Sequence, residues 1–492
     1  MPPLHLGHPV DAPDGRLAVD SADLTTHAVV VGMTGSGKTG LGIVLLEEAL
    51  LAGIPVLALD PKGDLGNLCL TFPELDAASF RPWIDEGAAR RDGLAPDDAA
   101  AAVAERWRAG LAASGLGPER IRELRAAAEV TVYTPGSTAG VPLNLIGSLA
   151  APPLAWETET EALRDEIEGT VTSLLGLVGV AADPLASREH VLLANILESA
   201  WRAGRDLDLA ALVAEVQRPP FRTLGVFELE TFLPEKERTA LALKLNALIA
   251  SPAFAAWVEG PPLDPQRLLF APDGRPRAAV VSLAHLTEEE RQLVVTLLLS
   301  KVVTWMRALP GTSDLRALVY MDEVFGYVPP TAVPPAKKPI LTILKQARAF
   351  GVGMTLATQN PVDLDYKAMA NAGTWLVGRL QTENDKARVL EGLRSAAGGT
   401  DVAELDRRIG ALDKRQFLLV SAHDPEPRVF ATRWAMSYLA GPLTKEQIAA
   451  LTPDRLREAP VAAASPASVP APAAPPPAAP AGVDHEEEWE AI

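Results

Sequence analysis

The sequence predicts an α/β protein built on a mainly parallel β-sheet, with a helical insertion and a disordered C-terminal tail. The first observation is a strand–helix–strand pattern, in which apolar segments at His27–Val31 and Ile54–Asp60 flank a helical segment at Gly35–Gly53. Such a strand–helix–strand unit is typical of a sheet whose strands run parallel. The second observation is that further apolar segments of strand length alternate with helical segments, which is typical of a parallel sheet covered by helices.

The remaining elements are assigned in chain order. An Ala-, Arg- and Glu-rich segment at Asp92–Ala128 predicts helix, and Val130–Tyr133 predicts the next strand. Residues 156–250 have helical patterns without strand signals of comparable strength, so we interpret them as an insertion in the core. The later strands are expected at Ala278–Leu283, Arg316–Met321, Gly353–Ala357, Thr374–Leu380 and Gln416–Ser421, with helices at Glu288–Ala308 and Lys338–Ala349.

These elements divide the chain into four parts. We expect an N-terminal part of the core at 1–150, a mainly helical insertion at 151–270, a C-terminal part of the core at 271–456 and a tail at 457–492. The tail is rich in Pro and Ala and ends in an acidic cluster. It has too little apolar surface to fold, so we predict disorder. It serves either as a solubilising linker or, through Glu486–Trp489, as a partner-binding tip.

Composition restricts the class of protein. Hydrophobic residues make up 48% and charged residues 22% of the 492 residues, as in ordinary soluble proteins. The longest apolar stretch, Leu293–Val303, is too short to span a membrane and contains Lys301. The N-terminus shows no secretion signal, and a single cysteine, Cys69, excludes an intramolecular disulfide and a cysteine-cluster metal site. We therefore expect a cytoplasmic protein with no membrane partner.

The net charge of −18 at pH 7 bears on nucleic-acid binding. Proteins that bind DNA non-specifically usually present a basic face. Any contact with DNA is therefore expected only in a pore or groove that has its own local charge.

A glycine-rich motif follows the first predicted strand of the strand–helix–strand unit. In such a loop the glycines allow successive backbone N–H groups to turn towards phosphates, and the helix that follows adds its positive N-terminus. Lys38 is predicted to neutralise the β- and γ-phosphates of ATP, and the hydroxyl of Thr39 to bind Mg²⁺. The motif G-x-x-x-x-G-K-[ST] is matched by Gly32, Met33, Thr34, Gly35, Ser36, Gly37, Lys38 and Thr39.

Two acids end the apolar strand at Arg316–Met321. We predict that Asp322 holds Mg²⁺ through a coordinated water and that Glu323 polarises the attacking water. Phosphoryl transfer depends mainly on positioning and charge neutralisation, so these two roles are sufficient together with Lys38. The order Asp-Glu favours hydrolysis over a nucleotide-dependent switch.

A polar residue at the end of another predicted strand completes the set. Gln359 follows the apolar segment that contains Thr355–Thr358. A polar side chain at such a position can contact the γ-phosphate, so Gln359 is our candidate sensor of the phosphate.

Taken together, these motifs resemble the HerA/FtsK superfamily of ring-forming P-loop motors, and most closely the bacterial, helicase-like HerA ATPases. The resemblance implies a RecA-like core, a hexameric ring with ATP at the subunit interfaces, and DNA translocated through the central pore. It also implies an arginine from the neighbouring subunit, for which Arg379 is slightly favoured over Arg348. The carrying segments are the P-loop, Asp60–Asp64, Asp322-Glu323, Gln346–Gly351, Ala357–Gln359 and Asn371–Gln381.

HerA proteins resemble one another in a β-barrel ahead of the P-loop, which we expect to be absent or vestigial here because little chain precedes Gly32. Two functions remain open at this point. The first is a DNA translocase or helicase-like ATPase, possibly stimulated by DNA. The second is an ATPase that moves or remodels protein, which the acidic charge suits better. A GTPase is less favoured because the sequence contains no N-K-x-D motif.

Overall fold

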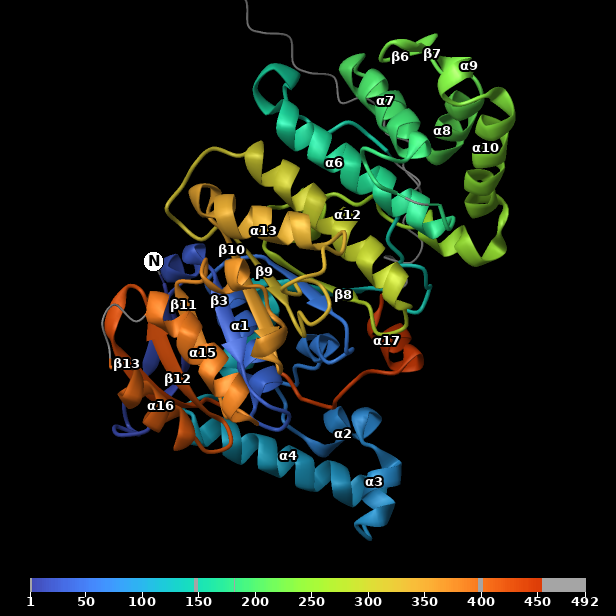
Figure 1. Cartoon of the computed structure of the whole chain (residues 1–492). Coiled ribbons are helices and arrows are strands. Elements are labelled where there is room, and N and C mark those ends of the chain that lie inside the picture. The colour runs from blue at the N-terminus through green and yellow to red at the C-terminus, as the bar shows by residue number, and fades with distance from the viewer. Residues whose placement is uncertain (1, 146–148, 181, 397–400, 454–492) are drawn as a thin grey trace, which may run out of the picture.

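The computed structural model describes residues 2–145, 149–180, 182–396 and 401–453. Within these residues one sheet has 11 strands in the order β2-β1-β13-β12-β11-β3-β10-β9-β4-β8-β5. Its strands β11, β3, β10 and β9 lie side by side (Figure 1). The tail that the sequence predicts to be disordered, at 457–492, lies outside the described residues.

The larger part of the sheet is parallel, and it contains the strands predicted from the sequence. Each neighbouring pair from β11 to β5 runs in the same direction. The predicted α/β fold with a mainly parallel sheet is therefore confirmed. The parallel strands are β11 (Thr374–Val377), β3 (Ala28–Val31), β10 (Val352–Thr358), β9 (Ala317–Met321), β4 (Val56–Asp60), β8 (Arg277–Ser282) and β5 (Glu129–Tyr133).

The opposite edge of the sheet is antiparallel and was only partly predicted. Of its strands, only β12 (Gln416–Ser421) was expected; the others are β13 (Asp424–Thr432), β1 (Pro3–Pro9) and β2 (Leu17–Asp20). Prolines in β1 and β13 weaken the sequence signal for a strand, because proline cannot donate to the ladder. The segment ahead of the P-loop is thus an extension of the main sheet.

Two hydrophobic cores lie on the two faces of the sheet. Alternate residues of the central strands face opposite sides, so Val29 and Leu57 belong to one core and Val30 and Ala58 to the other. On one face lie α1 (Lys38–Leu51), α4 (Pro96–Ala113) and α5 (Pro118–Ala127), with the short α2 (Ala77–Phe80) and α3 (Glu86–Arg91) beside α4. On the other face lie α12 (Glu288–Arg307) and α13 (Lys337–Gln346).

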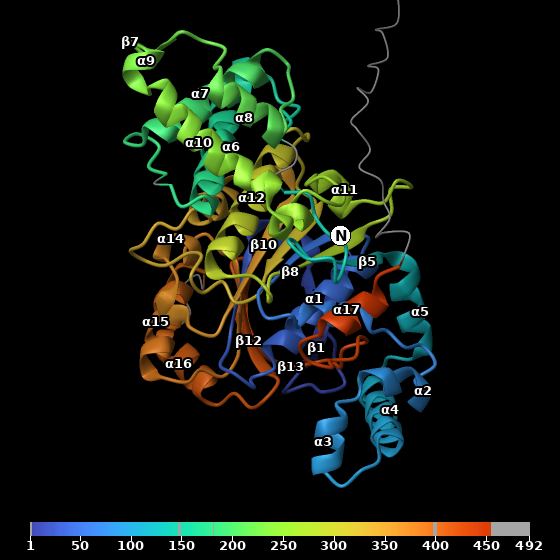
Figure 2. The same cartoon turned by 90° about the vertical axis from the view of Figure 1, so that its right-hand side faces the viewer.

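A group of helices is stacked beyond α12 and α13, away from the sheet (Figures 1 and 2). It packs on the core mainly through α6, whose Glu166 and Glu159 form ion pairs with Lys301 and Arg307 of α12. The division of the chain at 151–270 stays a prediction. The group contains α6 (Trp156–Leu177), α7 (Arg188–Arg202), α8 (Leu209–Gln217), β6 (Thr223–Leu224), β7 (Phe227–Glu228), α9 (Leu229–Phe232) and α10 (Glu235–Ala250).

The remaining helices are α11 (Pro265–Leu269), α14 (Tyr366–Met369), α15 (Glu383–Ala396), α16 (Val402–Gly410) and α17 (Lys445–Leu451). Among the residues that the structure describes, no helix combines the length and the apolar character that crossing a bilayer requires.

Candidate active site

The P-loop joins the end of β3 to the start of α1, in the middle of the parallel part of the sheet. Backbone hydrogen bonds hold its start: Gly32 N donates to Thr358 O of β10, and Met33 N donates to Arg379 O just after β11. Gly35 and Gly37 have φ angles of 78° and 103°, which favour glycine. The loop is therefore shaped by two neighbouring strands and by backbone conformations that a side chain would oppose.

Lys38 opens helix α1 with its side chain almost fully buried, at 5% exposure. Its Nζ lies 3.3 Å from Oε2 of Glu323 at the end of β9. Burial lowers the pKa of Lys38, whereas the carboxylates of Asp322 and Glu323 oppose this shift. The ammonium group thus lies at the loop where a phosphate chain is expected to bind.

Asp322 is buried at the carboxyl end of β9, and neither of its carboxylate oxygens has a hydrogen-bond partner among the described residues. Burial raises its pKa, while the charges of Lys38 and Lys62 oppose the rise. A buried carboxylate without partners is costly, and a hydrated divalent cation would satisfy it. Together with the hydroxyl of Thr39, which starts the same helix as Lys38, these donors fit the oxygen ligands that Mg²⁺ prefers.

Glu323 follows Asp322 and has a φ of 44°, a conformation that is rare for a residue with a side chain and is enriched at functional sites. Its Oε2 accepts a hydrogen bond from Lys62 Nζ at 2.6 Å. Burial by itself would raise the pKa of Glu323, but the charges of Lys38 and Lys62 hold it below its usual value. The carboxylate is therefore ionised at neutral pH and able to accept a proton.

Gln359 connects the P-loop to this glutamate. Its Nε2 donates to Glu323 Oε2 at 2.8 Å, and its Oε1 accepts a hydrogen bond from the hydroxyl of Thr34. Thr34 follows β3 and Glu323 follows β9. Gln359 follows β10, which lies between these two strands in the sheet. A change at the P-loop can thus reach the glutamate through a single amide.

Lys62 is a site residue to which our sequence analysis gave no role. It belongs to the loop after β4, which lies next to β9 in the sheet, so the loop and Glu323 emerge side by side. Asp60 fixes this loop: its carboxylate accepts backbone hydrogen bonds from Gly63 and Leu65. The signal in the sequence was the segment Asp60–Asp64, which places a lysine just after a predicted strand. The carboxyl ends of parallel strands lie together, so a lysine at this position can be inferred to lie near the P-loop.

The two arginine candidates lie at opposite ends of the strands. Arg379 is the second residue after β11, and its carbonyl contacts the P-loop of the same chain while its side chain is exposed. Arg348 lies in the 3-10 helix Ala347–Phe350, which precedes β10 and therefore sits at the amino end of the parallel strands. The side chain of Arg348 is also exposed.

Comparisons with known proteins agree with this arrangement. Residues 4–89 match the family model described as "Helicase HerA, central domain", a range that contains both the P-loop and the loop of Lys62. The resemblance to the HerA/FtsK superfamily of P-loop ATPases is confirmed. In structure, the chain is similar to VirB4 of Thermoanaerobacter pseudethanolicus, with a TM-score of 0.50 and 15% identity over 87% of this chain and 96% of that one.

Two other solved structures are similar over part or most of the chain. The genome packaging NTPase B204 of Sulfolobus turreted icosahedral virus 2 has a TM-score of 0.24 and 16% identity, over 32% of this chain and 69% of that one. The bacterial conjugative coupling protein TrwB has a TM-score of 0.44 and 14% identity, over 87% of this chain and 89% of that one. No curated protein matches the sequence.

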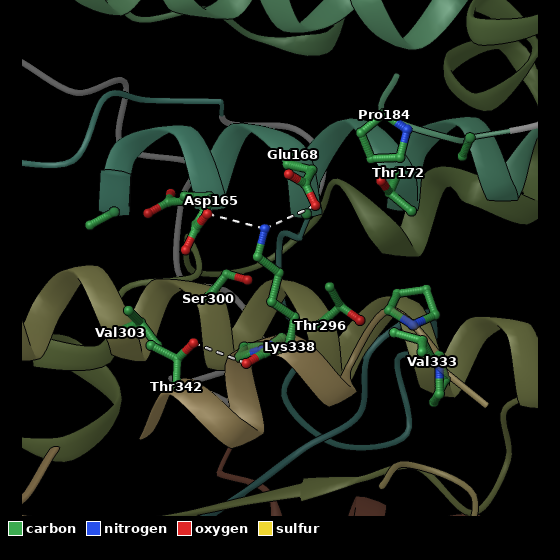
Figure 3. Close-up of a pocket in the computed structure, with 17 residues that line it drawn as sticks. Asp165, Glu168, Thr172, Pro184, Thr296, Ser300, Val303, Val333, Lys338 and Thr342 are labelled. Carbon is green, nitrogen blue, oxygen red and sulfur yellow. Dashed lines mark hydrogen bonds and ion pairs between the residues drawn. The ribbon is translucent and has the colours of Figure 1, made fainter. Parts of the chain in front are cut away.

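A cavity of about 270 Å³ lies elsewhere in the molecule, between α6, α12 and α13 (Figure 3). Asp165 and Glu168 point into it from α6, and both contact Lys338 Nζ of α13, at 3.1 and 2.9 Å. Glu166 also lines the cavity. No P-loop residue lines this cavity, so it lies apart from the predicted nucleotide site.

Proposed function

We propose that the chain is an ATP-hydrolysing motor of the HerA/FtsK type that works as a hexameric ring and translocates DNA through its central pore. The observation that carries the ATPase part is the meeting of Lys38, Asp322, Glu323 and Gln359 at the P-loop, although they come from three separate regions of the sequence. The HerA central-domain match and the shared fold with VirB4 support the class of motor.

The residues divide the work of hydrolysis. The P-loop amides and Lys38 bind the phosphates, while Thr39 and Asp322 would hold Mg²⁺, which neutralises charge on the phosphate oxygens. Glu323 accepts a proton from the water that attacks the γ-phosphorus, as the bond from that phosphorus to the bridging oxygen breaks. Gln359 positions Glu323 and reports the γ-phosphate through Thr34.

Substitution of the two charged residues tests this assignment. In Glu323→Gln we expect ATP binding to persist and turnover to fall about 100-fold or more, because loss of a general base typically costs this much. In Lys38→Ala we expect weaker binding of ATP itself, because the charge opposite the phosphates is removed. Calorimetry with ATP and Mg²⁺, together with phosphate release, separates the two effects. Wild-type turnover in Glu323→Gln would contradict its role as the base.

The DNA part of the proposal has its own test. We expect ATPase activity to rise when duplex DNA is added and particles of ring shape to be visible by negative-stain microscopy. The alternative is a motor that moves or remodels protein, which the net charge of −18 favours. That motor would hydrolyse ATP without any response to DNA, even at low salt, and would copurify with a protein bound through the C-terminal tail. Absence of both stimulation and low-salt DNA binding would overturn the DNA assignment.

A further inference from the structure

A second cavity adjoins the P-loop on the side away from Glu323. Its volume is about 340 Å³, within the range of roughly 300–1,000 Å³ that is usual for small-molecule sites. Two P-loop-side glycines, Gly37 and Gly40, form one wall, and residues that sequence analysis assigned to no site form the others. The lining comprises Gly37, Gly40, Arg106, Trp107, Lys414, Arg415, Thr432, Arg433, Trp434, Ala435 and Leu439.

The position of this cavity follows the direction of a bound phosphate chain. The γ-phosphate end is marked by Lys38 and by Thr34, whose hydroxyl reaches Gln359. A P-loop binds the α- and β-phosphates with its backbone amides near the first turn of the helix. The chain therefore leaves the loop past Gly37 and Gly40, which are the two glycines that line the cavity.

Gly37 packs closely against Arg415, so a side chain at Gly37 would not fit. A Cβ atom added at Gly37 would lie 3.2 Å from Cα of Arg415, and the φ of 103° at Gly37 also opposes a side chain. Arg415 is itself fixed against the loop, because its backbone N–H donates to Ser36 O at 2.8 Å. The cavity wall and the phosphate loop thus form one unit.

The walls offer an aromatic and cationic surface. The guanidinium of Arg415 lies 4.6 Å from the ring centroid of Trp434 and donates to the backbone oxygen of Thr432, so the stack is held in place. Trp107 meets Trp434 edge to face at 5.3 Å. The indole N–H groups of both tryptophans are buried and have no hydrogen-bond partner among the described residues.

The charged side chains of the cavity differ in how free they are to contact a ligand. Arg433 is already paired with Glu47 and Glu48, so it adds little free charge. Arg106 and Lys414 are exposed at the rim. An aromatic base would pack against the stack, and an anion leaving the P-loop would pass the two rim cations.

We propose that this cavity binds the nucleoside part of the triphosphate, with the base against the guanidinium of Arg415, which Trp434 supports from behind, and the ribose beside Gly40 and Leu439. This inference rests on the proposed ATPase function. It assigns recognition of the nucleoside to residues 106–107 and 414–439, which are far from the P-loop in the sequence. It makes the chain bind a nucleoside triphosphate more tightly than the bare phosphate chain.

The test compares ATP with inorganic tripolyphosphate, both with Mg²⁺, by calorimetry on the full chain. We expect the wild-type protein to prefer ATP, and Trp434→Leu and Arg415→Met each to weaken ATP binding about tenfold, the size expected for one lost base-stacking group. Tripolyphosphate affinity should stay within about twofold of wild type. Trp156→Leu is the matched control, because Trp156 forms a similar stack with Arg202, at 4.0 Å, outside this cavity.

The outcomes separate the two proposals. No binding of either ligand by the wild type would overturn the ATPase function itself. Equal affinity of the wild type for ATP and tripolyphosphate, or equal weakening of both ligands in the variants, would overturn only the nucleoside site.

A second experiment needs no variant and therefore does not depend on a variant's folding: the wild-type protein is photolabelled with 8-azido-ATP. We expect the label on the tryptic peptide Trp434–Lys445, which carries Trp434 and Leu439. Labelling confined to peptides that contain no lining residue would contradict the proposal.

Discussion

One carboxylate oxygen of Glu323 is shared by three side-chain donors. Its Oε2 lies 2.6 Å from Lys62 Nζ, 2.8 Å from Gln359 Nε2 and 3.3 Å from Lys38 Nζ. An oxygen engaged in this way is poorly placed to accept a proton from water. In the proposed mechanism a bound triphosphate would attract both lysines and so release the oxygen for the reaction.

Replacement of Lys62 tests this dependence through pH. In the proposed mechanism the rate requires ionised Glu323 and is lost as the pH falls through its pKa, which the charges of Lys38 and Lys62 lower. In Lys62→Met that pKa rises, so we expect the acid limb of the ATPase rate profile to move to higher pH. Lys62→Arg keeps the charge and serves as the control. An unmoved limb, or one moved to lower pH, would contradict the assignment.

His27 is a second residue whose state is fixed by burial. It is 2% exposed at the start of β3, and its Nδ1 accepts a hydrogen bond from Met354 N at 3.1 Å. Burial lowers its pKa from 6.5 to about 4. The unfolded chain binds this proton more readily than the folded one. The contribution of His27 to the free energy of unfolding is therefore fully present above about pH 6.5 and is lost as the pH falls towards 4.

From this shift we expect the free energy of unfolding to fall by about 2.5 kcal/mol between neutral pH and about pH 4.5 through His27 alone. Urea unfolding of the wild type and of His27→Asn measures the difference. Asn cannot titrate, tolerates the φ of 64° and retains an acceptor for Met354 N. The same pH dependence in both proteins would show that His27 makes no contribution.

At the scale of elements, helix α1 is tied to the C-terminal part of the chain by a buried ionic cluster. Arg433, just after β13, is 0% exposed and lies 2.9 Å from both Glu47 and Glu48 of α1. Its Nε also donates to His5 O of β1. The helix that carries Lys38 is therefore held by the antiparallel edge of the sheet.

Removal of this arginine should be costly. In Arg433→Met two buried carboxylates lose their counter-charge, so we expect a loss of about 3–5 kcal/mol in the free energy of unfolding. Arg428→Met, in β13 itself, is the matched control, because its pair with Asp424 is exposed at 41% and 39%, and an exposed pair contributes about 0–1 kcal/mol. Urea unfolding with similar losses in both variants would refute the role of burial.

At the scale of the whole molecule, the P-loop and Arg348 lie at opposite ends of the parallel strands, because the P-loop follows β3 and Arg348 precedes the neighbouring β10. Arg379 lies beside the P-loop of its own chain. In the proposed ring, a residue remote from its own P-loop has no role in its own site and is free to contact a neighbour's. On this ground we propose Arg348 for the shared role; the slight preference for Arg379 from the sequence stays a prediction.

Mixing of inactive subunits distinguishes the two arginines. Glu323→Gln mixed with Arg348→Ala should regain ATPase activity, because one composite site receives its glutamate and its arginine from different chains. Glu323→Gln mixed with Arg379→Ala should remain inactive if Arg379 acts within its own chain. Recovery only in the Arg379 mixture would reverse the assignment, and recovery in neither would exclude sharing by either residue.

Local patterns in the sequence determined the parallel core and the nucleotide motif. The β3–P-loop–α1 unit is encoded in consecutive residues, because an apolar run, three glycines and a helical repeat each act over a few positions. The acids after β9 and Gln359 after β10 could be proposed for the same reason, since strand ends of one parallel sheet share an edge.

Only the tertiary structure decided which distant segments meet. Lys62 reaches Glu323 because β4 and β9 are neighbours, and the Arg415–Trp434 stack borders the P-loop because β12 and β13 fold back towards it. Strand order and burial depend on contacts between residues hundreds of positions apart, such as Arg433 with His5. No local pattern records such pairings, which is why the antiparallel edge and the second cavity emerged only from the fold.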